Sequence, residues 1–171
     1  MAIILASFNK KINLIGISTT AGNQGVEKTT KNALNALNIT GLISKREKSL
    51  NDLNELKLSD CLEYGGLKFP VIKGCAKPLI RPGVLCGEIH GESGLEGAYL
   101  PNIPQNAVDF TEQLSQQTRH FTTLMYEYFK NFGSQITIVI TGPMTNIALL
   151  LLNYPDVIKF ISKIVFMGNS I

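Results

Sequence analysis

Ile136-Thr-Ile-Val-Ile140 is a short run of β-branched residues, and Thr141-Gly-Pro-Met-Thr-Asn146 follows it directly. The first run predicts a buried strand. The second predicts a turn into a helix that has Pro143 in its first turn and that Tyr154-Pro155 ends. Ile164-Val-Phe-Met167 predicts the next strand. A strand, a helix and a strand in this order form the repeating unit of a parallel sheet.

The same alternation extends toward the amino terminus. Ile12–Ser18 and Phe69–Ile72 predict further buried strands, and Val26–Ile39 predicts a helix. Another helix is expected from about Ala107 to Phe132, because apolar side chains recur there at helical spacing. Met1–Phe8 also predicts a helix. Strands that are continuously apolar and alternate with helices predict an α/β fold, an open, mainly parallel sheet with helices on both faces.

The chain is interpreted as a single domain, 1–171, with an exposed insertion at 41–66 that is rich in Lys, Ser, Asn and Leu. An apolar helix at residue 1 with no cap normally follows a strand in this architecture. A final strand that is followed only by a short loop lacks the crossover helix that would connect it to a further parallel strand. We therefore expect the chain to be a piece of a larger α/β domain.

Polar loops that contain glycine follow the predicted strands. Ligands of open parallel sheets bind at the carboxyl ends of the strands, so a functional site is expected there. The densest loop is Glu88-Ile-His-Gly-Glu-Ser-Gly-Leu-Glu-Gly97, where glycines permit turns and His and Glu can hold or move protons. The composition of this stretch predicts neither helix nor strand. The strand-end loops are 19–25, 73–104, 141–146 and 168–171.

Composition disfavours several functional classes. The 171 residues carry a formal net charge of +3, and the one basic cluster, Lys45-Arg-Glu-Lys48, contains an acidic residue, so nucleic-acid binding is unsupported. Three cysteines without a C-x-x-C pair argue against a disulfide framework or a structural zinc site. They predict reduced thiols in a cytoplasmic protein. The apolar segments 1–8 and 147–152 are too short to span a membrane.

Several segments carry a resemblance to a known family, in that family's order and at compatible spacing. They are Leu14-Ile-Gly-Ile-Ser-Thr-Thr-Ala-Gly-Asn-Gln24, Val71-Ile-Lys-Gly-Cys-Ala-Lys-Pro-Leu79, Ile89-His-Gly-Glu-Ser-Gly-Leu95, Thr141-Gly-Pro-Met-Thr-Asn-Ile-Ala148 and Ile164-Val-Phe-Met-Gly168. Through them the chain resembles the inosine-uridine preferring nucleoside hydrolases. The resemblance covers most of the chain outside 41–66, but only about the first half of a family member.

The resemblance implies an enzyme that hydrolyses the N-glycosidic bond of ribonucleosides to ribose and a free base, in nucleoside salvage. It implies a Ca²⁺ ion, held by an Asp-rich motif, that binds the ribose hydroxyls and a water. An aspartate deprotonates this water as it attacks the anomeric carbon. Nearby negative charge suits the reaction, because the departing base leaves an oxocarbenium-like sugar. Full-length members are expected to be homo-oligomers with a ribonucleoside substrate.

Four positions match site residues of the family. Asn23 is expected beside the metal and the ribose, and Met167 is expected to line the ribose pocket. The backbone carbonyl of Thr141 is expected to be a metal ligand, since hard oxygen donors suit Ca²⁺. His90 is expected near the departing base, as a candidate proton donor. Each also has a structural alternative: Asn23 can serve a turn, Thr141 can end a strand, and Met167 can belong to the core.

The chain also departs from the family's pattern. The Asp-rich metal motif, expected just before Met1–Phe8, is absent, and so are a Glu-Phe-Asn ribose segment and a later His-Asp pair. Asn169 replaces an expected glycine. We therefore expect weak Ca²⁺ binding and little hydrolysis from this chain alone, and exposed apolar surface. The aspartates that are present, none of them in a predicted strand-end loop, are Asp52, Asp60, Asp109 and Asp156.

The main alternative is a non-catalytic remnant that binds ribose or a nucleoside, or that serves as an interaction module. A phosphate-binding protein that uses Gly91–Gly97 is disfavoured, because no Gly-Lys-Ser/Thr follows and no helix start is evident there. A hydrolase with Ser93 as nucleophile is also disfavoured. Gly91-Glu-Ser-Gly94 lacks the G-x-S-x-G spacing, and no strand leads directly into it.

Overall fold

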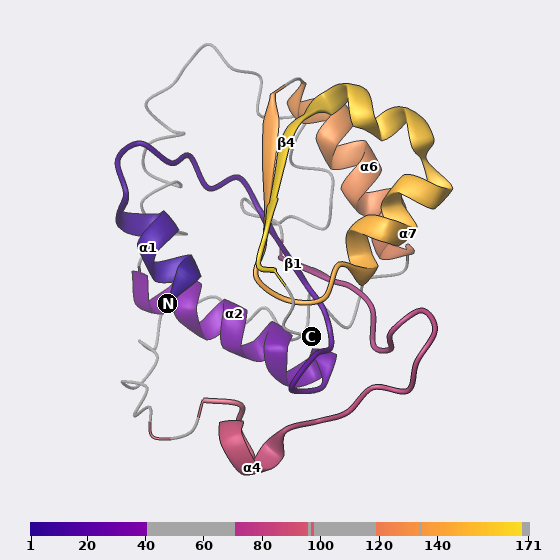
Figure 1. The fold of residues 1–171 in the computed structure, drawn as a ribbon. Helices are drawn as coiled ribbons and strands as arrows, with labels where there is room; N and C mark the ends of the chain where they lie inside the picture. Colours follow the sequence, from indigo (N-terminus) through magenta and orange to yellow (C-terminus); the bar gives the residue numbers. More distant parts are fainter. Residues whose placement is uncertain (41–70, 96, 98–118, 134, 169–171) are drawn as a thin grey trace.

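The computed structural model describes residues 1–40, 71–95, 97, 119–133 and 135–168 (Figure 1). Parallel strands and helices alternate, which confirms the predicted α/β class. The predicted insertion at 41–66 lies outside these residues. No helix among them is long and apolar enough to cross a membrane. The elements are α1 (Ala2–Phe8), β1 (Ile17–Thr19), α2 (Val26–Thr40), β2 (Val71–Lys73), α4 (Gly87–His90), α6 (Phe121–Phe132), β3 (Ile136–Ile140), α7 (Thr145–Asn153), the 3₁₀ helix η2 (Pro155–Phe160) and β4 (Ile161–Phe166).

The strands form two separate parallel pairs within the described part of the chain. β1 pairs with β2, so that Ile17 lies opposite Val71. β3 pairs with β4, so that Ile138 lies opposite Ile164, after a register shift near Ile136. Figure 1 shows α1 and α2 on one side of the strands and α6 and α7 on the other.

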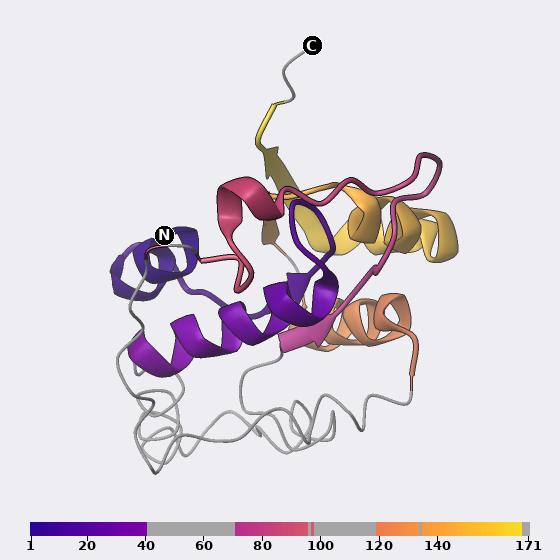
Figure 2. The same ribbon diagram turned by 90° about the horizontal axis from the view of Figure 1, so that it is seen from below.

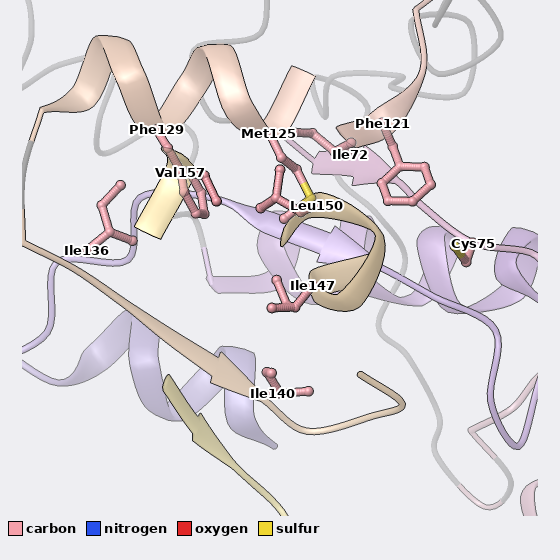
Figure 3. Close-up of a cluster of buried hydrophobic side chains, with 10 residues drawn as sticks. All are labelled: Ile72, Cys75, Phe121, Met125, Phe129, Ile136, Ile140, Ile147, Leu150 and Val157. Carbon is pink, nitrogen blue, oxygen red and sulfur yellow. The ribbon is translucent and has the colours of Figure 1, made fainter. Parts of the chain in front are cut away.

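Successive residues of β2 point into different cores. Val71 packs with Leu34 and Leu37 of α2. Ile72 belongs to a larger cluster with residues of α6, α7 and β3 (Figure 3). Because neighbouring residues of a strand face opposite sides, these contacts confirm that helices cover both faces of this sheet. The larger cluster consists of Ile72, Cys75, Phe121, Met125, Phe129, Ile136, Ile140, Ile147, Leu150 and Val157.

The other sheet has one uncovered side. Ile136 and Ile140 of β3 are buried, whereas Thr137 and Val139 of the alternate row are exposed. Val139 is 66% exposed although it is apolar. The continuous apolar run predicts burial of both rows, and this expectation is wrong for β3, because within the described part of the chain no element covers its second face.

β1 is shorter than the strand predicted over Ile12–Ser18. It begins at Ile17, because the described part of β2 offers partners only from Val71 to Lys73. Ile12 is 47% exposed, and the carbonyl of Ile15 accepts a hydrogen bond from the hydroxyl of Tyr128 instead, at 2.6 Å. Residues 69 and 70 of the other predicted strand lie outside the described residues.

His120 sets the start of α6. The predicted helix residues 107–118 lie outside the described part, but Arg119 and His120 are described and are not helical. His120 is extended, and its Nδ1 accepts a 3.4 Å hydrogen bond from the backbone N–H of Thr122, which caps the helix. α6 ends at Phe132 as predicted, and Gly133, with a φ of 99°, is its C-cap.

Two further boundaries differ from the prediction. Pro143 precedes α7, because Met144 is its N-cap and the helix begins at Thr145. β4 begins at Ile161 rather than Ile164, because β3 supplies pairing partners from Ile136 onward. The helix predicted over Val26–Ile39 and the strand predicted over Ile136–Ile140 are confirmed.

The long loop predicted over 73–104 contains a helical turn, α4, from Gly87 to His90. The prediction that Glu88–Gly97 contains no helix is therefore wrong for its first three residues. Gly91, with a φ of 67°, ends the turn and reverses the chain. α4 has no buried residue, so apolar packing does not hold it in place.

We expect Leu150→Ala to lower the free energy of unfolding by about 2–5 kcal/mol, because Leu150 is fully buried between α6, α7 and η2 and truncation leaves a cavity. Urea denaturation measures this loss. Leu152→Ala on the same helix is the matched control. Leu152 is 70% exposed, so its truncation should change stability by less than about 1 kcal/mol. Equal losses in both variants would contradict the described core.

Candidate functional site

The loops that follow β1, β2 and β3 meet at the carboxyl ends of the strands, where the sequence predicts a site. The N–H of Ala21 donates to the carbonyl of Cys75 at 2.8 Å and joins the first two loops. A Cβ placed on Gly22 would lie 3.2 Å from Cδ of Pro143, so the loop after β3 is also adjacent. The loops that contain Asn23 and Thr141 are therefore neighbours.

Asn146 is the buried polar residue at this junction, and it is only 5% exposed. Its Oδ1 accepts from the backbone N–H of Cys75 at 2.9 Å. Its Nδ2 donates to the carbonyl of Thr19 and to Oγ of Ser18, both at 2.8 Å. The sequence pattern places Asn146 only at the end of a predicted turn, without a role of its own. An asparagine at the start of an otherwise apolar helix is the signal that could have identified it.

Gly74 and Cys75 are shaped by this junction. A Cβ on Gly74 would lie 2.2 Å from Nδ2 of Asn146 and 2.5 Å from the carbonyl oxygen of Thr19, so only glycine fits without displacing them. Burial raises the pKa of the Cys75 thiol, which keeps it protonated and unreactive. Cys75 and Cys86 are both free cysteines, and Cys61 lies outside the described residues.

Asn23 and His90, predicted from two separate motifs, are in direct contact. Nδ2 of Asn23 lies 2.8 Å from Nε2 of His90. An amide nitrogen only donates, so in this orientation Nε2 accepts and the ring proton resides on Nδ1. The N–H of Cys86 also donates to the carbonyl of Asn23 at 2.9 Å. Figure 2 shows α4 beside the loop that precedes α2.

Thr141 and Met167 lie at neighbouring strand ends. The N–H of Met167 donates to the carbonyl of Ile140 at 3.0 Å, which continues the pairing of β3 with β4. Met167 is 69% exposed, so the alternative that it belongs to the core is wrong. Thr141 is also exposed. The hydrogen bonds of the described residues join neither of them directly to Asn23 or His90.

The described residues do not fit a Ca²⁺ site. Nowhere among them do three His, Cys, Asp or Glu side chains come close enough to share a metal ion. Ca²⁺ takes six to eight oxygen ligands, chiefly carboxylates and carbonyls, and the predicted Thr141 carbonyl would supply only one. Glu88 and Glu92, the described carboxylates nearest His90 in sequence, are exposed.

The inosine-uridine preferring nucleoside hydrolase family matches residues 53–171 of the chain. The chain belongs to this family. The pyrimidine-specific ribonucleoside hydrolase RihA of Escherichia coli O7:K1 is 32% identical over 173 residues, which include 99% of this chain and 44% of RihA. The chain thus spans less than half the length of this relative.

Solved nucleoside hydrolases share its fold. The purine-preferring ribonucleoside hydrolase from Gardnerella vaginalis is 25% identical, with a TM-score of 0.63 over 99% of this chain and 44% of that one. The plant nucleoside hydrolase PpNRh1 is 23% identical, with a TM-score of 0.67 over 99% and 43% of the two chains. These similarities agree with the order of strands and helices described above.

We expect Gly74→Ala to destabilise the chain by about 3 kcal/mol, because the new methyl group displaces the Asn146 amide from its partners. Gly25→Ala is the control, since a Cβ on Gly25 meets no atom within 4 Å. Urea denaturation should show a change below about 1 kcal/mol for the control. A Gly74→Ala variant as stable as the control would contradict the close contact.

Proposed function

We propose that this chain forms part of the nucleoside-binding site of a ribonucleoside N-ribohydrolase, which cleaves the N-glycosidic bond to give ribose and a free base. The observation that carries the proposal is the 2.8 Å contact between Asn23 and His90. The two residues belong to separate segments that resemble the family, and each was expected to face the nucleoside. The free thiols of Cys75 and Cys86 are consistent with salvage of nucleosides in the cytoplasm.

The chemistry of the two side chains suits opposite ends of a nucleoside. The amide of Asn23 both donates and accepts hydrogen bonds, as ribose hydroxyls require. The imidazole of His90 can donate a proton to the nitrogen of the departing base. When water adds to the anomeric carbon, it loses a proton to a general base, the aspartate that the resemblance implies, and the C–N bond breaks. The electron pair of that bond leaves with the nucleobase, which the proton from His90 neutralises. A bound nucleoside would replace the bond between Asn23 and His90 with bonds of its own.

Thr141 and Met167 are proposed to face the ribose, Thr141 through its backbone carbonyl and Met167 through its thioether. Their position at adjacent strand ends supports this assignment. The Ca²⁺ ion implied by the resemblance would supply charge stabilisation and an activated water when bound. Because the described residues do not assemble its carboxylate ligands, the proposed role of this chain is confined to binding the substrate and protonating the base.

A second candidate is a nucleoside- or ribose-binding module without catalysis. The lack of a metal-binding cluster among the described residues favours it, because the contact between Asn23 and His90 needs no metal to form. The two candidates predict the same binding, and turnover by this chain would exclude the second. Binding and turnover are therefore assayed on the same preparation.

We expect this chain to release little or no base from inosine or uridine, with or without added Ca²⁺, because the described residues offer too few hard oxygen ligands. Chromatographic separation of free base from nucleoside measures this. Both nucleosides are needed because the relatives are named for pyrimidine and for purine substrates. Robust turnover that depends on Ca²⁺ would contradict the expectation and exclude the non-catalytic candidate.

We expect Asn23→Ala to weaken the binding of inosine or uridine about tenfold, because one hydrogen-bonding group is lost from the proposed site. Isothermal titration calorimetry measures the dissociation constant. Asn35→Ala, which removes the same group from the middle of α2, is the matched control and should bind like the parent chain. If the parent chain binds neither nucleoside, or Asn23→Ala binds as tightly as the control, the proposed site is wrong.

A further inference from the structure

We propose that Gln24 is a positioning residue that holds the loop 86–95, and with it His90, against Asn23. This inference rests on the proposed function, because His90 and Asn23 are the groups that it orients. Gln24 is next to Asn23 in sequence, but its side chain points into the molecule and is 7% exposed. The side chain of Gln24 therefore contacts the loop from the buried side, whereas Asn23 is exposed.

The central contact joins Gln24 to the residue after His90. Nε2 of Gln24 donates to the carbonyl of Gly91 at 2.8 Å. Gly91 ends α4 with a φ of 67°, a conformation that favours glycine. The buried amide of Gln24 thus holds the backbone at Gly91, where the chain reverses its direction immediately after His90.

A neighbouring contact on α2 strengthens the attachment. Nδ2 of Asn32 donates to the carbonyl of Ser93 at 2.9 Å. Gly94, with a φ of 80°, lies close to both amide side chains. A Cβ on it would come within 3.0 Å of Cγ of Gln24 and 3.2 Å of Nδ2 of Asn32. The loop backbone therefore rests directly on both amide side chains.

Apolar packing among the described residues does not hold this segment. α4 has no buried residue, and Ile89 on its surface is 67% exposed. The preceding stretch is also exposed, with Ile80 at 93% and Val84 at 77%. Because apolar burial does not fix α4, hydrogen bonds hold its position. Those of Gln24 and Asn32 act together with the bond from the N–H of Cys86 to the carbonyl of Asn23 and with the contact between Asn23 and His90. A buried amide such as that of Gln24 is costly without a partner, which favours the docked loop even before a nucleoside binds.

Docking of the loop in advance has a consequence for binding. A loop that is already ordered loses less conformational entropy when the ligand arrives, so affinity rises. Gln24 should therefore influence the affinity for a nucleoside without touching it. This separates it from Asn23, which is proposed to contact the nucleoside directly.

The test compares Gln24→Leu, which keeps the size of the side chain but removes the donor, with Asn35→Ala as control. Hydrogen exchange of residues 86–95, read by mass spectrometry, should accelerate about threefold to tenfold in Gln24→Leu and remain unchanged in the control. Exchange in α7 and β3 should stay unchanged in both variants. Gly94→Ala should loosen the same segment while leaving Gln24 intact.

The two histidines of the chain provide a site-specific signal. In Gln24→Leu, the imidazole ¹⁵N resonances of His90 should move toward those of a free ring, because its bond to Asn23 is lost. The resonances of His120, which caps α6, should not move. Nucleoside affinity should fall about threefold to tenfold with the melting temperature unchanged.

The outcomes distinguish the possibilities. Unchanged exchange at 86–95 and unchanged His90 resonances in Gln24→Leu would overturn the inference. Faster exchange throughout α2 and β1, with a lower melting temperature, would also overturn it, because Gln24 would then be a general structural residue. If the loop loosens as expected but the parent chain binds neither inosine nor uridine, the positioning role stands and the proposed function fails.

Discussion

The side-chain amide of Asn146 is buried where the ends of β1 and β2 meet the start of α7. Both its oxygen and its nitrogen are hydrogen-bonded. Its oxygen accepts from Cys75, and its nitrogen donates to Thr19 and Ser18. Within the described residues, no strand pairing connects the two sheets, so this amide and the shared apolar cluster hold α7 in register with β1 and β2. A packing of α7 that lacked these hydrogen bonds would leave several buried polar groups unpaired. Each unpaired group would lower the stability by about 1–3 kcal/mol.

The functional edge follows from that junction. With the ends of β1 and β2 fixed, the loop after β1 turns at Gly22 against Pro143 and presents Asn23 outward and Gln24 inward. The two neighbouring residues then have different tasks. One lies on the surface beside His90, and the other contacts the backbone that carries His90. Asn23, which is exposed, and Gln24, which is buried, thus connect the packed strands and helices to the loop 86–95, which contains no apolar core of its own.

Sequence patterns predicted the parts of the fold that depend on local burial. The apolar stripe of α2 and the β-branched run of β3 indicated these elements correctly, because their burial follows the residue period. The boundaries of β1 and α6 could not be predicted, because they depend on the pairing offered by β2 and on the capping by His120. The convergence of the loops that carry Asn23 and His90 was predicted from their place after the strands, but the direct contact between the two side chains was not. The roles of Asn146 and Gln24 were not, since both depend on tertiary contacts from residues distant in sequence.

The division into two strand pairs also bears on how the molecule assembles. β3 and β4 are separated only by α7 and η2, so their pairing closes a short stretch of chain and loses little entropy. β1 and β2 lie on either side of α2 and a long intervening segment, and their pairing comprises only three residues on each strand. Contacts that are close in sequence generally form faster than distant ones. The carboxyl-terminal unit is therefore suited to fold first and to act as the template on which β1 and β2, guided by Asn146, complete the functional edge.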